Sequence, residues 1–193
     1  MSIAEQAILD RVNADNWALL YRCRWSKPDA EQVVPQLEKL LESEDSDITN
    51  EALRALFRIE TPAVSTATSV ATLTQSQEPM TKQLAVLALG QISHKVPALC
   101  VEALASVLTD PVCCRDAMRA LAFIGPKADS ALERVLQRFS DPDARIRKAA
   151  VVTAVAIDGT HPGVIELIGK ASADRSKIVR DAAAQCLRKA RIG

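Results

Sequence analysis

The stretch Leu84-Ala-Val-Leu-Ala-Leu-Gly-Gln-Ile92 places alanine, leucine and isoleucine at the spacing of one helical face. The same pattern returns about every 33 residues, as the sequence shows. Its alanine stands at Ala52, Ala85, Ala117, Ala150 and Ala183. Its leucine column reads Leu56, Leu89, Leu121, Ala154 and Leu187, and its isoleucine column reads Ile59, Ile92, Ile124 and Ile157. A fixed period of this length indicates stacked supersecondary units.

Each unit divides into two predicted helices. The first helices are expected over 30–41, 63–73, 96–108, 128–139 and 163–171, and the second over 46–59, 79–92, 111–124, 142–157 and 176–191. Asp110 and Asp141, each followed by proline, are predicted to cap second helices. Gly125 and Gly159 are predicted to end helices in the left-handed conformation.

The repeat predicts one all-α domain over 1–193, a right-handed α-α superhelix (a solenoid) of about six helical hairpins. Residues 29–193 make five repeats of about 33 residues. Residues 1–28 are expected to form a degenerate N-terminal capping hairpin, because the phase of the repeat is lost there.

The charges balance, with 24 Lys and Arg against 24 Asp and Glu, which gives no global attraction to nucleic acid or to an anionic membrane. Residues 29–60 are rich in acids and residues 170–193 in bases, so the two ends differ in sign. The five cysteines have no paired spacing and suit reduced structural thiols. With no apparent secretory signal and no apolar run long enough for a bilayer, we expect a cytoplasmic protein without a membrane partner.

The segments Asp141-Pro-Asp-Ala-Arg-Ile-Arg-Lys-Ala-Ala150 and Ile178-Val-Arg-Asp-Ala-Ala-Ala-Gln-Cys-Leu187 resemble the short HEAT-like repeat named after phycobilin lyases. The resemblance covers residues 30–191 and implies an α-solenoid. That pattern has a basic residue three positions before the alanine, which Lys82, Arg147 and Arg180 supply and from which Thr49 and Cys114 depart. It implies little about function, because one fold serves many unrelated proteins.

Catalytic motifs are missing from the sequence. The repeated His-Glu pairs of HEAT-like di-iron hydroxylases have no counterpart, since the two histidines, His94 and His161, precede Lys and Pro. Cys113 and Cys114 are adjacent and lack the spacing of a zinc or redox motif. HEAT-like DNA glycosylases use aromatic residues, which are scarce here. We therefore expect no catalytic residue, no cofactor and no metal, and nucleic acid is disfavoured as a partner.

The best interpretation is a non-catalytic scaffold or adaptor that binds a protein partner, one with an acidic segment, on the concave face lined by the second helices. Five cations from successive second helices are predicted to line one groove: Arg54, Lys82, Arg119, Arg147 and Arg180. Solvated flank residues, or ion pairs within each repeat, are the alternative interpretation of the same cations.

A second candidate surface is the face of Trp17, Tyr21 and Trp25, which are spaced for one side of a helix. Its alternative role is a hydrophobic lid on the first full repeat. Two other functions stay open as alternatives: a subunit of a bilin-lyase-like enzyme, and a weak nucleic-acid binder that uses the C-terminal basic cluster. The sequence does not decide between the two surfaces.

Overall fold

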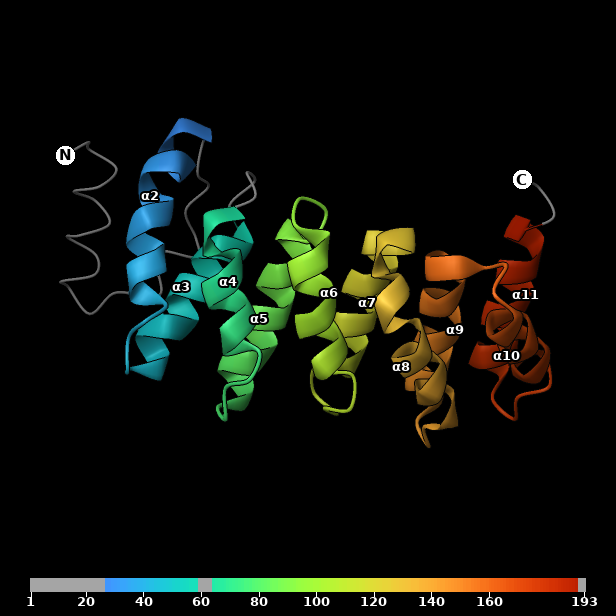
Figure 1. The fold of residues 1–193 in the computed structure, drawn as a ribbon. Coiled ribbons are helices and arrows are strands. Elements are labelled where there is room, and N and C mark those ends of the chain that lie inside the picture. Colours follow the sequence, from blue (N-terminus) through green and yellow to red (C-terminus); the bar gives the residue numbers. More distant parts are fainter. Residues whose placement is uncertain (1–26, 59–63, 191–193) are drawn as a thin grey trace. The chain divides into compact units, whose positions relative to one another are not determined.

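The computed structural model describes residues 27–58 and 64–190, with side chains over 34–57 and 64–188, and every regular element in these ranges is helical (Figure 1). The all-α class predicted from the repeat is therefore confirmed. The helices group into two compact units, Met1–Val96 and Pro97–Gly193. The sequence-based assignment of one domain to residues 1–193 stays a prediction.

The first unit contains two layers of helices in its described part. Helix α3 packs against α2 and α5, and α4 packs against α5. A buried hydrogen bond joins α5 to α3, because Thr81 Oγ1 donates to Asn50 Oδ1 over 2.8 Å. The elements are α2 (Lys27–Leu40), α3 (Ser46–Arg58), the 3-10 turn η2 (Val64–Thr66), α4 (Ala67–Leu73) and α5 (Pro79–Ile92).

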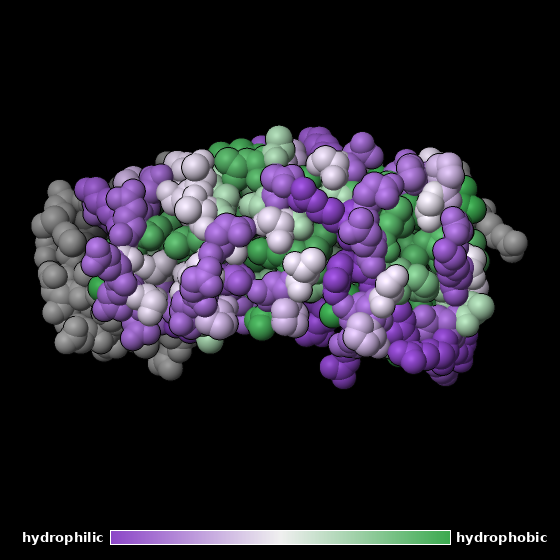
Figure 2. Space-filling view, turned by 60° about the horizontal axis from the view of Figure 1, so that its bottom comes forward, coloured by the Kyte–Doolittle hydropathy of each residue, from purple (hydrophilic) through white to green (hydrophobic). Residues whose placement is uncertain are grey.

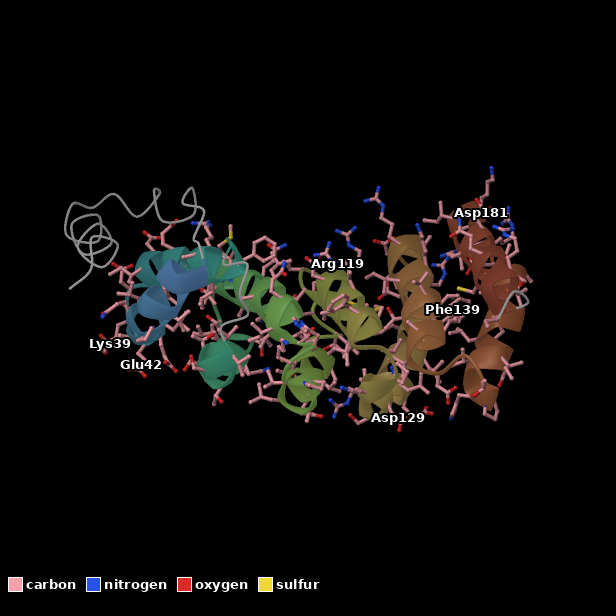
Figure 3. All side chains as sticks on the ribbon, turned by 90° about the horizontal axis from the view of Figure 1, so that it is seen from above. Lys39, Glu42, Arg119, Asp129, Phe139 and Asp181 are labelled. Atoms are coloured by element: carbon pink, nitrogen blue, oxygen red, sulfur yellow. The ribbon has the colours of Figure 1, made fainter. Side chains whose placement is uncertain are left out.

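The second unit places α7, α9 and α11 side by side in one layer, and α6, η3, α8 and α10 in the other. Viewed from above, these elements form two rows (Figure 3). Their bounds are α6 (Pro97–Ser106), α7 (Cys114–Ile124), η3 (Gly125–Ala131), α8 (Leu132–Gln137), η4 (Arg138–Ser140), α9 (Ala144–Asp158), α10 (Pro162–Ser172) and α11 (Lys177–Ala190).

The repeated alanine lies in the core, on the packed side of the second helices. All five members of its column are completely buried, and a side chain of this size lets neighbouring helices approach closely. The leucine column is buried as predicted at Leu56, Leu89 and Leu121. Leu187 is the exception at 45% exposed, since the described part of the chain places no helix over that side of α11.

The starts of two second helices differ from prediction. Helix α7 begins at Cys114, because Asp110 Oδ1 accepts the N–H groups of Val112 and Cys113 and closes a turn there. Helix α9 is capped by Asp143, which accepts the N–H of Arg145 over 2.8 Å, and not by Asp141. Helix α5 spans Pro79–Ile92 as predicted.

The two glycines predicted to end helices behave differently. Gly125 has φ +67° and ends α7, whereas Gly159 has φ −68°, so the prediction of a left-handed Gly159 is wrong. The carboxylate of Asp158 closes that turn by accepting from Thr160 and His161. The helix predicted over 128–139 is divided into η3, α8 and η4, with Ala128 outside helical geometry.

Candidate partner-binding surface

The repeat places three residues of each second-helix segment on the side opposite the buried alanine. Successive residues of a helix are about 100° apart around its axis. Three positions therefore lie about 140–160° around the helix from the alanine: the one five residues before it, the one two residues before it and the one two residues after it. In the second unit all nine residues at these positions are exposed. They fall into three rows from α7 and the turn before it, α9 and α11: Val112, Arg145 and Ile178; Arg115, Lys148 and Asp181; Arg119, Val152 and Gln185.

A hollow of about 510 Å³ lies within this surface, and we call it the basic groove. Helices α7, α9 and α11 all contribute to it. Four cations and five small or aliphatic residues line it, and no acidic side chain is among the lining residues. The lining residues are Arg115, Arg119, Ala122, Arg145, Lys148, Ala149, Val152, Thr153 and Ile178.

The cations of the basic groove are largely uncompensated. Arg119 approaches Asp116 at 3.3 Å, an exposed pair that contributes little. Among the described residues, no carboxylate lies within 4.0 Å of the cationic nitrogens of Arg115, Arg145 or Lys148. In Figure 3, Arg119 and the exposed Asp181 of α11 lie on the side of the second helices, and Asp129 of η3 lies on the opposite side. The groove is therefore a site of positive potential.

The five cations predicted to line one groove fall into two different columns of the repeat. Arg54 and Arg119 stand two residues after the alanine, whereas Lys82, Arg147 and Arg180 stand three before it. Five residues along a helix separate the two columns by about 140°. Arg54 and Lys82 belong to the first unit, where Arg54 pairs with Glu51 and Lys82 is half-buried. Only Arg119 lines the basic groove.

Arg147 corrects the prediction most clearly, because its side chain was expected to line an open groove and is only 6% exposed. Its Nε and Nη2 donate to Asp174 Oδ2 and Oδ1, each over 2.9 Å. Its Nη1 donates to the carbonyl oxygens of Asp141 and Pro142. The hydrogen bonds from Arg147 hold the pKa of Asp174 down at about 2, although burial acts against this. Arg147 is thus a structural residue.

Arg180 repeats half of this arrangement one period later. Its Nη1 donates to the carbonyl oxygens of Asp174 and Arg175, which precede it by six and five residues. Arg147 donates to carbonyl oxygens at the same two separations. Its side chain is exposed, and among the described residues no carboxylate pairs with it. Arg180 therefore braces the turn before α11 and does not reach the basic groove.

The structure also explains why Cys114 can occupy the basic column. Cys114 occupies the position of Arg147 one period earlier. At this position α7 therefore has no guanidinium that could pair with Asp141, the equivalent of Asp174. Arg138 of η4 supplies one instead, in an ion pair with Asp141. Burial raises the pKa of the Cys114 thiol, and the nearby Arg138 opposes that rise. The cysteine at a position where three other repeats have a cation was the sign, in the sequence, that another residue must pair with Asp141.

Nucleophilic and metal chemistry finds little support in the described ranges. Cys100, Cys113, Cys114 and Cys186 are all buried, and burial raises the pKa of Cys100 to about 11, which leaves it a poor nucleophile at neutral pH. Within residues 27–58 and 64–190, no three His, Cys, Asp or Glu side chains gather as metal ligands. The same part of the chain contains no helix long and apolar enough to cross a membrane.

The predicted site residues did not include five members of the groove, which are Arg115, Arg145, Lys148, Val152 and Ile178. They could have been found by counting from the buried alanine, because each stands at one of the three outward positions. The aromatic face of Trp17, Tyr21 and Trp25 lies outside the described residues.

Several engineered proteins of known structure have a similar arrangement of helices. One engineered protein of the Northeast Structural Genomics Consortium matches with a TM-score of 0.74 and 19% identity over 100% of both chains. A designed armadillo repeat protein in complex with the peptide (KR)4 matches with a TM-score of 0.73 and 16% identity over 91% of both chains. This chain has an α-solenoid repeat fold.

Another engineered protein from the same consortium matches with a TM-score of 0.70 and 23% identity, over 90% of this chain and 88% of its own. At such identities the likeness concerns the fold alone. No protein-family model matches the chain, and no curated protein matches it either. The resemblance to the phycobilin-lyase-type repeat is therefore supported for its solenoid architecture and has no support for a lyase.

Proposed function

We propose that this α-solenoid is a non-catalytic scaffold or adaptor that binds an acidic segment of a protein partner in the basic groove. The observation that carries the proposal is the lining of the hollow, in which four cations meet and no carboxylate takes part. Charges arranged in this way steer an oppositely charged partner to the surface and fix its register.

The comparison with solved structures supports binding of a peptide by this kind of fold, since one designed armadillo repeat protein is described in complex with the basic peptide (KR)4. The groove of the present chain carries positive charge, so it fits a peptide of the opposite sign. The hollow also has Ala149 and Val152 in its lining. Apolar lining suits a peptide side chain better than a nucleic-acid backbone, whose contacts are mainly electrostatic.

Charge reversal tests the proposal. The double variant Arg115→Glu with Lys148→Glu should bind a fluorescein-labelled glutamate-rich peptide about ten-fold more weakly than the unchanged protein, or more weakly still, as measured by fluorescence anisotropy. The difference should shrink as salt rises, because the Debye length falls from about 10 Å at 0.1 M to about 3 Å at 1 M.

The matched control is Arg134→Glu with Lys170→Glu, on α8 and α10. Both side chains are exposed, belong to the other layer, and give the same change in net charge. Circular dichroism should show unchanged helicity for both double variants. If both double variants bound the peptide equally weakly, the loss of affinity would come from net charge and not from the groove. No weakening by either would make the groove a solvated surface, and the face of Trp17, Tyr21 and Trp25 would become the candidate.

A further inference from the structure

Two aliphatic side chains are exposed inside the basic groove. Val152 of α9 is 41% exposed and Ile178 of α11 is 42% exposed, and both line the same hollow. A single exposed aliphatic residue is ordinary on a protein surface. Two of them in one hollow, beside four cations, make a place where an apolar side chain of a ligand would lose water.

The groove is polarised along the layer of second helices. Its cations come from α7 and from the first half of α9, at Arg115, Arg119, Arg145 and Lys148. Its two exposed aliphatic side chains, Val152 and Ile178, come from the second half of α9 and the start of α11. The exposed Asp181 follows Ile178 by three residues, so it lies on the same side of α11.

This arrangement also limits where carboxylates of a ligand can lie. They are attracted over α7 and the first half of α9, whereas no cation of α11 lines the hollow and Asp181 adds a negative charge on that side of α11. An all-acidic segment would therefore use only part of the hollow. The face drawn in Figure 2, which is turned away from the groove, carries polar side chains (purple) with apolar areas (green) between them. Within the groove, an apolar area adjoins the cations directly.

We propose that the segment held by the basic groove is an acidic peptide with one apolar anchor residue, which packs on Val152 and Ile178 while its neighbouring carboxylates pair with Arg115, Arg119, Arg145 and Lys148. This inference rests on the proposed function, because it names the occupant of the same groove. The charges set the approach and register of the peptide, and the buried anchor slows its release.

Two labelled peptides test the inference. One is glutamate-rich with a single central leucine, and the other has serine in place of that leucine at equal length and charge. The leucine peptide should bind the unchanged protein about ten-fold more tightly, since burial of one aliphatic side chain is enough for such a ratio. The double variant Val152→Ser with Ile178→Ser should bind both peptides with the affinity that the unchanged protein has for the serine peptide.

This design is a double-mutant cycle, so it isolates the contact between the anchor and the two aliphatic side chains. Both substituted positions are exposed, and circular dichroism should show unchanged helicity. The control variant is Ile165→Ser on α10, which is 59% exposed in the other layer and should leave the preference for leucine intact.

The outcomes separate the two proposals. Equal binding of both peptides, with loss of binding on reversal of Arg115 and Lys148, would overturn the anchor and keep the acidic segment. Binding of neither peptide, with no effect of charge reversal, would overturn both. If single-stranded DNA of equal charge displaced the leucine peptide at equal concentration, the groove would be a general anion surface and the inference would fail.

Discussion

Arg147 of α9 holds the carboxylate of Asp174, which precedes α11, through two hydrogen bonds of 2.9 Å, from Nε to Oδ2 and from Nη2 to Oδ1. The contact joins two successive repeats, because the two residues stand 27 positions apart. Both side chains are buried, and Asp174 Oδ1 also accepts the N–H of Ser176. Bidentate pairs of this kind fix geometry as well as charge.

Removal of this guanidinium should be costly, and its repeat equivalent supplies the control. Arg147→Ala should lower the free energy of unfolding by about 3–5 kcal/mol, because it leaves Asp174 buried without its cation. Arg180→Ala should lower it by about 0.5 kcal/mol or less, since Arg180 is exposed and bonds only to backbone carbonyls. Urea denaturation followed by circular dichroism measures both. If both variants lost the same free energy of unfolding, the ion pair with Asp174 would add no stability to that of the hydrogen bonds from Nη1 to the backbone carbonyls.

The pair also predicts a dependence of stability on pH. The pKa of Asp174 is about 2 in the folded protein and about 3.9 for an unperturbed aspartate. A lowered folded-state pKa stabilises the fold above the unfolded value, and this stabilisation disappears as pH falls from about 4 to about 2. The difference in urea midpoint between the unchanged protein and Asp174→Asn should therefore be largest near pH 5 and narrow towards pH 2. A difference that stays constant over this range would contradict the assignment, and the exposed Asp129→Asn should follow the unchanged protein throughout.

The sequence predicted the fold because burial in a repeat is periodic. The alanine and leucine columns mark the side of each second helix that packs, and small or aliphatic residues recur there because they contact the neighbouring helices. Helix α5 was predicted to the residue. Periodicity alone does not predict burial at Leu187. This residue belongs to the leucine column but is 45% exposed, because no described helix covers that side of α11.

The site was harder to predict because cations occur on two sides of the same helices. Arg119 and Arg147 both stand outside the alanine and leucine columns, yet one is exposed in the groove and the other is buried against Asp174. Arg147 is buried because Asp174, in the turn of the next repeat, packs against it, whereas Arg180 stands at the same position one period later, has no such partner among the described residues and is exposed. The approach of Asp174 is a tertiary contact, and the helical spacing of one repeat does not contain it.

The same substitution, leucine to alanine, can be compared at a buried and at an exposed position of the leucine column. Leu89 is completely buried in α5, so Leu89→Ala should cost about 2–5 kcal/mol through lost transfer energy and an unfilled cavity. Leu187→Ala should cost less than about 1 kcal/mol, because its side chain is already 45% exposed. Thermal and urea unfolding of the two variants compare the positions. A cost below about 0.5 kcal/mol at Leu89 would mean that the phase of the repeat is misassigned.

Two glycines of the second unit, Gly125 and Gly159, make a matched pair for backbone strain. Gly125 has φ +67° and ψ −135°, a region that side-chain-bearing residues rarely adopt, and it closes α7. Gly125→Ala should lower the free energy of unfolding by about 1–3 kcal/mol. Space is not the cause, because an added Cβ would meet the carbonyl oxygen of Ala156 at an ordinary 3.6 Å.

Gly159 lies in the right-handed region at φ −68°, and a Cβ there would meet the carbonyl oxygen of Val155 at 3.5 Å. Gly159→Ala should therefore be neutral or stabilise the protein by up to about 1 kcal/mol, because alanine restricts the unfolded chain more than glycine does. Urea midpoints of the two variants, measured side by side, give the sign of each effect. If Gly125→Ala were as well tolerated as Gly159→Ala, the positive φ would not constrain the connection between α7 and η3, and a loss of stability at Gly159 would mean that its turn needs the freedom of glycine after all.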